Sequence, residues 1–306
     1  MTFKKMRGPI ESPYQLHLGL PFVSTSVFPL STHTMPFFIH CVDPSLGKVD
    51  KSSFSQETLM EILIADLEEN AFMFGPKDDP RPIALWKGLR MEDETVQCIV
   101  WGVSNLIGSI NLKYLPATVM YLELTGNHLT GSLDLKELSP VLQDFTFSRN
   151  EFTGDFNLTC LPDSFEHLDG TENQLSGSLN LEHLPQRLVT LSLAKNLFTG
   201  IIFLTKLPPS MSMLCINDNR LSGPIDVTSL PAGMRSLFVN QNAFEGKTDF
   251  SRLPKSLETL YVSHTKLSGE IYAKQWLIGG VERDFYVEES QVTIHWIEEG
   301  GWCLLS

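Results

Sequence analysis

Leucine and other apolar residues recur along most of this chain with a fixed period of 23 residues. A typical unit reads L-x-L-x-x-N-x-L-x-G-x-L-x-L-x-x-L-P-x-x-L-x-x. Asparagine marks the units at Asn127, Asn150, Asn173, Asn196, Asn219 and Asn242. Glycine follows four residues later and defines eight units, at Gly108, Gly131, Gly154, Gly177, Gly200, Gly223, Gly246 and Gly269. A constant period of this length predicts a solenoid of stacked coils.

Each part of the unit predicts a local structure. The L-x-L segment alternates with period two and predicts a strand with its leucines inward, and successive strands then form one parallel sheet. The asparagine can turn its amide inward and bond backbone groups of neighbouring coils. Glycine permits the positive φ that turns the chain away from the strand. The L-P ending favours extended or 3₁₀ structure on the return side instead of long helices.

These motifs resemble the leucine-rich-repeat family over residues 98–273. The L-x-G-x-L/I element resembles plant-type repeats, and the L-P ending resembles repeats of protist and bacterial proteins. The resemblance implies a right-handed, mainly β solenoid with its parallel sheet on the concave face, and it implies binding more often than catalysis. Four departures from the pattern predict local soft spots: Gly170 at an inward strand position, Ser139, which displaces the proline to Pro140, and Thr248 and Ala273 in the inner column.

The flanks of the repeats predict caps, because a solenoid exposes an apolar end at each terminus. Residues 1–50 predict an irregular extension, since prolines interrupt their apolar stretch. A targeting peptide is the alternative, because Lys4, Lys5 and Arg7 precede a Ser/Thr-rich, acid-poor stretch. Residues 51–97 predict an N-terminal cap with one helix, begun by a capping box at Ser53 and Gln56 and ended at Gly75. Residues 274–306 predict a C-terminal cap with one or two strands.

Composition excludes several classes of function. The formal net charge of −13 would repel a phosphate backbone, so nucleic acid is not expected as a direct partner. Five scattered cysteines without a C-x-x-C pair argue against a zinc site or a disulfide framework, and favour a reducing, cytoplasmic location. No apolar run is long enough for a transmembrane helix. We find no nucleotide-binding, metalloprotease or hydrolase motif, and expect no cofactor, no metal and no enzymatic activity.

The register of the repeat assigns candidate contact residues. Aromatic and polar residues gather toward the C-terminal end of the predicted concave face, and aromatic side chains are enriched in binding hot spots. The predicted concave contact residues are Met213, Cys215, Asn217, Phe238, Asn240 and Tyr261. Packing within the sheet would also explain Phe238 and Tyr261. A second, lateral patch comprises Leu197, Ile201 and Phe203, where other repeats carry mostly polar residues; the N-terminal extension is an alternative cover for it.

Two short motifs predict modifications. Asn157-Leu158-Thr159 is a glycosylation sequon that a secreted protein could use. The last four residues fit a prenylation box at Cys303, although the same cysteine could simply pack into the C-terminal cap. The function predicted from the sequence is a non-enzymatic protein-binding or scaffold module. A structural subunit of a large complex and a secreted or surface recognition protein are the two alternatives.

Overall fold

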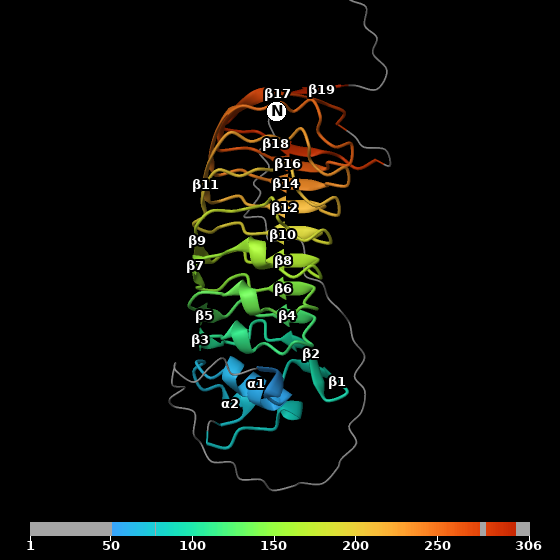
Figure 1. Cartoon of the computed structure of the whole chain (residues 1–306). Coiled ribbons are helices and arrows are strands. Elements are labelled where there is room, and N and C mark those ends of the chain that lie inside the picture. The colour runs from blue at the N-terminus through green and yellow to red at the C-terminus, as the bar shows by residue number, and fades with distance from the viewer. Residues whose placement is uncertain (1–50, 77, 276–279, 298–306) are drawn as a thin grey trace, which may run out of the picture. The chain divides into compact units, whose positions relative to one another are not determined.

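A computed structural model describes residues 51–76, 78–275 and 280–297. The chain divides into two units, residues 1–49 and residues 50–306, and the described residues lie in the second. The predicted extension over residues 1–50 lies outside the described residues. The second unit is a solenoid of stacked coils, as the 23-residue period predicts (Figure 1).

The L-x-L segments form a ten-stranded sheet along one side of the stack (Figure 1). Neighbouring strands are parallel and in register, as in the pairing of Leu191 with Leu168 and Leu214, while β1 pairs antiparallel with β2. The central leucines are buried and the residues beside them are half-exposed, as period two requires. The strands, in their order in the sheet, are β1 Leu89–Glu92, β2 Thr95–Val100, β4 Tyr121–Glu123, β6 Asp144–Thr146, β8 His167–Asp169, β10 Thr190–Ser192, β12 Met213–Cys215, β14 Ser236–Phe238, β16 Thr259–Tyr261 and β18 Asp284–Tyr286.

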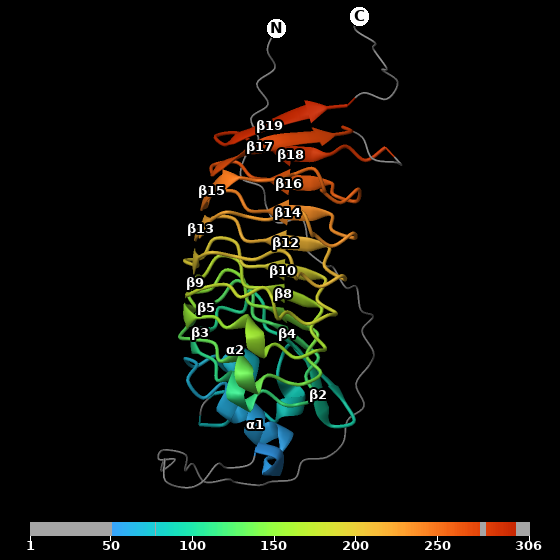
Figure 2. The ribbon, with the colours of Figure 1, turned by 45° about the horizontal axis from the view of Figure 1, so that its top comes forward.

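A second set of strands follows the asparagines and lies along another side of the stack (Figure 2). The repeat glycine lies within, at the end of or directly after each early strand of this set and has a positive φ, for example 87° at Gly131, which an L-residue with a Cβ adopts only with strain. The strands are β3 Ile107–Ser109, β5 His128–Thr130, β7 Thr153–Asp155, β9 Gln174–Ser176, β11 Thr199–Gly200, β13 Arg220–Gly223, β15 Ala243–Lys247, β17 Lys266–Ala273 and β19 Gln291–Trp296.

The return side consists of 3₁₀ turns and extended segments, which confirms the prediction from the L-P ending. The first three repeats carry the 3₁₀ helices η3 Leu112–Tyr114, η4 Leu135–Glu137 and η5 Leu158–Cys160. A side-chain oxygen seven residues after the asparagine position caps most of these turns by accepting from the backbone N–H two residues later. The capping residues are Asp134, Asn157, Asn180, Asp226 and Asp249.

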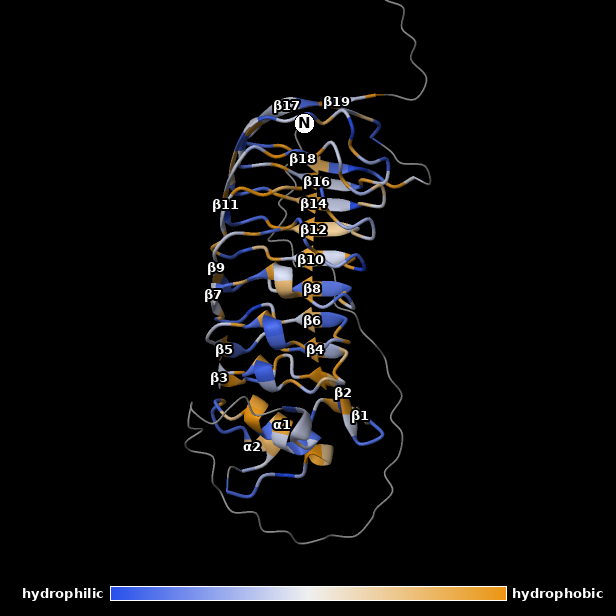
Figure 3. Ribbon diagram, in the orientation of Figure 1, coloured by the Kyte–Doolittle hydropathy of each residue, from blue (hydrophilic) through white to orange (hydrophobic). Residues whose placement is uncertain are grey.

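Apolar side chains of every coil meet in one continuous core between the sheet and the return side, visible as orange inward positions in Figure 3. Gly170, which the sequence predicts as a soft spot, is accommodated by a larger neighbour. A Cβ on Gly170 would lie 2.5 Å from Cζ of Phe147, so the Phe147 ring of the preceding coil fills this space. Phe147 also packs edge-on against Phe152, at 5.7 Å between ring centroids.

The repeat asparagines form a buried ladder that joins each coil to the coil before it. Oδ1 of Asn127 accepts from the backbone N–H groups of Ser104 and Leu106, each at 3.0 Å. Its Nδ2 donates to the carbonyls of Trp101, at 2.9 Å, and Leu124, at 2.8 Å. The other asparagines repeat this pattern, with a donor 21 residues back and an acceptor 26 residues back, as in Asn196. This confirms the structural role predicted for the asparagine.

The ladder has a direction, and its ends differ from its middle. The coil of Ser104 is the first, and the Ser104 side chain donates only within its own bend, to the Gly102 carbonyl at 3.2 Å. The hydroxyl of Thr265, at the last equivalent position, donates to the Val262 carbonyl of its own coil at 2.7 Å. Polar groups of the bends from Ser104 to Asn219 are therefore satisfied by the asparagine of the following coil.

We expect Asn127→Ala to lower the free energy of unfolding by about 3 kcal/mol, because it leaves several buried backbone groups without partners. Urea denaturation of the purified chain measures this loss. Gln174→Ala, at an exposed position of β9, is the control and should change stability by less than about 0.5 kcal/mol. Equal midpoints for the two variants would show that the asparagine ladder does not stabilise the fold.

Thr248 is the soft spot that the structure bears out most directly. Its side chain is 3% exposed, and its Oγ1 has no hydrogen-bond partner within the described residues. The equivalent residues in the neighbouring coils are the buried Ile225 and Ile271. Burial of an unpartnered hydroxyl opposes folding.

Thr248→Val should therefore raise the free energy of unfolding by about 1 kcal/mol, because it replaces the unpartnered hydroxyl with a methyl group of similar size. Thr248→Ser is the matched control: it keeps the hydroxyl, removes the methyl and should destabilise the protein. Thermal and urea unfolding measure both. A Val variant less stable than the native chain would show that the hydroxyl has a stabilising partner.

The N-terminal cap contains two short α-helices where the sequence predicted one. Helix α1 spans Gln56–Leu63 and α2 spans Ala71–Phe74. The N-cap of α1 is Ser55, whose Oγ accepts from the N–H of Thr58, so the predicted capping box at Ser53 is wrong. Between the helices the chain pairs with the first repeat through a bridge from Leu67 to Gly108, which ends the helical spacing. Gly75 ends α2 with a φ of 90°, as predicted.

The C-terminal cap contains two strands, as predicted. Strand β18 extends the large sheet, with Tyr286 opposite Tyr261. Strand β19 pairs with β17 over six residues and brings His295 against Tyr272, with stacked rings 4.6 Å apart. Together they continue the ten-stranded sheet and the second set of strands past the last 23-residue repeat.

Candidate functional site

The exposed face of the ten-stranded sheet presents three columns of side chains, set by the parallel register. The first column precedes the central leucine of each strand, the second follows it, and the third lies two residues beyond. Met213, Cys215 and Asn217 represent the three columns in one coil, and Phe238 and Asn240 lie beside them in the next. The structure thus places the six predicted concave residues on one surface of neighbouring coils.

An aromatic ladder runs along the second column at its C-terminal end. Phe238 and Tyr261 lie edge to face, with centroids 4.9 Å apart and an interplanar angle of 72°. Tyr261 continues to Tyr286 at 5.7 Å. Tyr286, which is 42% exposed, escaped the sequence prediction because the last coil is longer: Tyr261 and Tyr286 are 25 residues apart instead of 23. The alternation of apolar and polar residues over residues 284–297, which predicts strands, was the signal that could have placed Tyr286 on this face.

Carboxylates lie beside this ladder and are oriented by its hydroxyls. The Tyr261 hydroxyl donates to Oδ2 of Asp284 at 2.6 Å. The Tyr286 hydroxyl donates to a carboxylate oxygen of Glu288, and this hydrogen bond raises the pKa of Tyr286. Both carboxylates are exposed. The ladder therefore combines aromatic faces with fixed negative charge.

The two asparagines of the predicted patch differ in their hydrogen bonds. Nδ2 of Asn217 donates to the neighbouring Asp218, whereas Oδ1 of Asn240 is buried without a hydrogen-bond partner within the described residues. Burial raises the pKa of the Cys215 thiol to about 12, with a smaller contribution from the charge of Asp169. Cys215 therefore stays protonated at neutral pH, which disfavours a role as a nucleophile.

The N-terminal half of the same face is acidic. Burial raises the carboxyl pKa of both Glu123 and Asp144, and burial also raises the pKa of Tyr121 to about 12. Burial disfavours the charged form of both carboxyl groups, so their ionisation lowers the free energy of unfolding at neutral pH. This destabilisation is lost as the pH falls below the range in which the two groups titrate. Sequence reasoning did not select this half of the face.

The lateral residues Ile201 and Phe203 are each 52% exposed, while Leu197 is half-buried. All three side chains point outward from the coil that contains β11, with the exposed Thr199 between Leu197 and Ile201. Ile201 rests on the next coil, since a Cβ on Gly223 would lie 2.7 Å from Cγ2 of Ile201. Phe203 occupies the column in which Asp134, Asn157, Asn180, Asp226 and Asp249 cap the return turns, and a phenyl ring cannot accept the backbone N–H.

We expect Phe203→Asn to raise the free energy of unfolding by about 0.5–1 kcal/mol, because the amide restores the cap that Asn180 and Asp226 supply in adjacent coils. Urea denaturation checks the gain. Phe203→Ala is the matched control, since it removes the ring without adding a cap. If Asn is no more stabilising than Ala, the capping column does not extend to this position.

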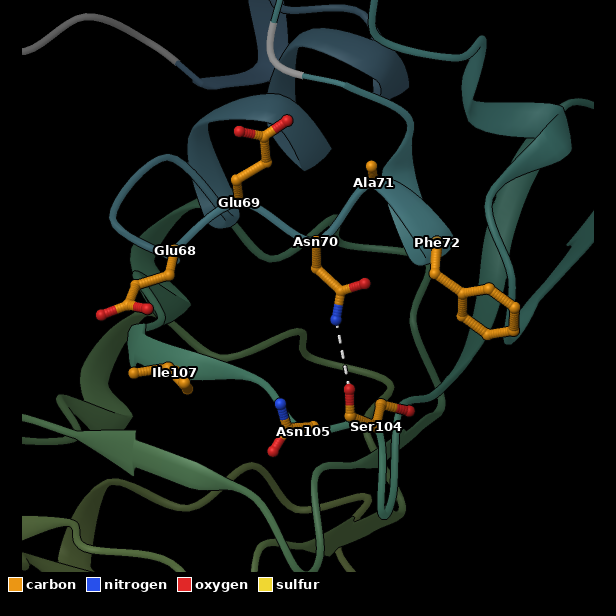
Figure 4. A pocket seen from close by; sticks show the side chains of 8 residues that line it. All are labelled: Glu68, Glu69, Asn70, Ala71, Phe72, Ser104, Asn105 and Ile107. Carbon is orange, nitrogen blue, oxygen red and sulfur yellow. Dashed lines mark hydrogen bonds between the residues drawn. The ribbon is translucent and has the colours of Figure 1, made fainter.

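A shallow depression of about 450 Å³ lies where the N-terminal cap meets the first repeat (Figure 4). Nδ2 of Asn70 crosses it and donates to the Ser104 carbonyl at 3.1 Å. Glu68 and Glu69 flank it, and Phe72 is 68% exposed beneath the Lys87 ammonium. The described lining residues join the N-terminal cap to the first repeat, and they do not converge on a common point as the groups of a catalytic centre do.

The predicted modification sites have different positions. Asn157 is exposed at the start of η5, where its Oδ1 accepts from both the N–H and the hydroxyl of Thr159. This capping role accounts for the asparagine without a glycan. Cys303 lies outside the described residues.

Within the described ranges, no group of three His, Cys, Asp or Glu side chains is placed to hold a metal ion. In the same part of the chain, no helix has the length and apolarity to cross a bilayer. Cys98, Cys160 and Cys215 are free thiols.

Comparison with known proteins shows the fold. No family model and no curated protein sequence matches the chain. Among solved structures, the PEPR1-AtPEP1 structure aligns with 72% of this chain at 18% identity and a TM-score of 0.52. The leucine-rich-repeat ectodomain of the receptor kinase GASSHO1/SCHENGEN3 from Arabidopsis thaliana, in complex with CASPARIAN STRIP INTEGRITY FACTOR 2, aligns with 78% at 20% identity and a TM-score of 0.52.

YopM from Yersinia enterocolitica WA-314 aligns with 60% of the chain at 28% identity, with a TM-score of 0.46. The aligned regions cover 32%, 29% and 36% of the PEPR1, GASSHO1/SCHENGEN3 and YopM chains. The chain therefore spans about a third of the length of these neighbours.

Proposed function

Because the chain is a leucine-rich-repeat protein, with a 23-residue register that its fold reproduces, we propose that it is a non-enzymatic protein-binding or scaffold module. It engages its partner through the exposed face of the ten-stranded sheet. The observation that carries this proposal is the aromatic ladder of Phe238, Tyr261 and Tyr286. Half-exposed aromatic side chains on a rigid sheet supply large contact area at little cost in conformational entropy.

Two further observations support a binding role. The face is built from short strands whose positions are fixed by the core and by the asparagine ladder, so its side chains are preorganised. The GASSHO1/SCHENGEN3 ectodomain, which shares the fold, is described in complex with another factor. We propose the patch of Ile201 and Phe203, with the half-buried Leu197 on the same coil, as a second contact surface, since the ring of Phe203 replaces a stabilising cap.

The two alternative functions lead to different observations. A structural subunit of a large complex would bury the lateral patch in a permanent and more apolar interface, so the isolated chain would associate or aggregate. A secreted recognition protein could carry a glycan on the exposed Asn157. The three free thiols agree with the cytoplasmic location that we propose.

The combined change Phe238→Ala and Tyr261→Ala should weaken capture of native protein partners by about tenfold or more, because it removes two rungs of the ladder. Quantitative affinity capture from cell extract, followed by mass spectrometry, measures this. The truncations should also cost about 1 kcal/mol of stability through the lost ring pair, so capture is compared at equal folded fraction.

The matched control is Tyr272→Ala, which removes an exposed, stacked aromatic residue from the other strand set. It should leave capture unchanged. Capture that is equal for the ladder variant and the native chain would rule out the sheet face as the contact surface.

A further inference from the structure

The exposed sheet face carries an unbalanced charge. From β4 to β18, the three columns of the described residues include five carboxylates and no Lys or Arg, although the whole chain contains 23 basic residues. Arg90 of β1 lies at the N-terminal edge of the sheet, opposite Cys98. The five are Glu123, Asp144, Asp169, Asp284 and Glu288. Within the described residues, none of them forms an ion pair with Lys or Arg, which leaves their charge uncompensated by the protein.

Basic side chains at the borders of this face are already engaged. On one border Arg149 and Lys195 both pair with Glu172, and these contacts lower the pKa of Glu172. On the other border Arg235 pairs with Glu258 at 2.9 Å. The Arg283 guanidinium donates to backbone carbonyls, including that of Leu257 at 2.9 Å. These four positive charges are therefore not directed onto the face between β4 and β18.

The aromatic ladder adds sites that suit a guanidinium or ammonium group. The faces of Phe238, Tyr261 and Tyr286 attract cations, and a planar guanidinium can stack on a ring while it bonds a carboxylate. Asp284 and Glu288 are held beside the rings by the two tyrosine hydroxyls. The groups therefore favour a positively charged donor.

From this complementarity we infer that the sheet face binds an extended, arginine- or lysine-rich segment of a partner protein. The inference rests on the proposed binding function and specifies its partner. The aromatic ladder anchors one end of the segment, and Glu123, Asp144 and Asp169 extend the same surface toward the N-terminal coils. From β4 to β18 the face measures about 34 Å, which about ten extended residues span.

The test uses three synthetic peptides of about ten residues on the full chain. One alternates arginine with serine, one replaces each arginine by the neutral isostere citrulline, and one replaces it by glutamate. Fluorescence anisotropy measures binding at low and at physiological ionic strength. The arginine peptide should bind about tenfold or more tightly than the citrulline peptide, with weaker binding at higher salt, and the glutamate peptide should not bind.

Variants distinguish this surface from general attraction to an acidic protein. Asp284→Asn with Glu288→Gln should weaken the arginine peptide by about fivefold or more. Asp226→Asn with Asp249→Asn removes the same charge from the return side, where asparagine can still cap the turns, and should change binding by less than about twofold. Equal losses in the two double variants, or equal affinity for arginine and citrulline peptides, would overturn the inference.

Failure here is separable from failure of the proposed function. If Phe238→Ala with Tyr261→Ala abolishes capture of native partners but the arginine peptide shows no preference, the binding face stands and the cationic partner is wrong. If neither experiment shows dependence on the ladder, both proposals are wrong.

Discussion

The bend that follows each strand buries backbone N–H and C=O groups that have no partner in their own coil, and the structure depends on satisfying them. The amide of one asparagine per repeat does this by bridging two adjacent coils, for example Asn196 between the N–H of Leu175 and the carbonyl of Gly170. Neither Asp nor Leu offers both a donor and an acceptor at this point. This side chain acts together with the parallel backbone pairing of the strands, which sets the register of the sheet and aligns its exposed columns.

Much of the fold could be predicted because each position of the 23-residue unit occurs in several repeats, so each structural assignment rests on several residues. One misleading unit, such as that of Gly170, is corrected by several others, and the structure shows Phe147 filling the space that glycine leaves. Prediction was weaker where redundancy ends. The N-terminal cap contains a break that depends on the bridge between Leu67 and Gly108, a contact over forty residues that local helical spacing cannot reveal.

The candidate site follows the same rule. Phe238 and Tyr261 could be assigned to the exposed face from their register, but Tyr286 could not, because the longer last coil breaks that register. The hydrogen bonds of Asp284 and Glu288 with the tyrosine hydroxyls depend on side-chain geometry, which the spacing of residues in the sequence does not predict. The Asn and Asp residues that cap the return turns recur at a fixed position of the repeat and could have been recognised in the sequence. At Phe203 this cap is replaced by an exposed phenyl ring of the lateral patch.

The direction of the asparagine ladder has a consequence for how the chain is made. Each bend from that of Ser104 to that of Asn219 is completed by the amide of the coil that follows it, so a coil leaving the ribosome lacks these hydrogen bonds until the next coil has emerged. At a synthesis rate of about 5–20 residues per second, a repeat of this length takes about one to five seconds. The bend of Asn242 has no such wait, because the hydroxyl of Thr265 in the next coil bonds within its own coil.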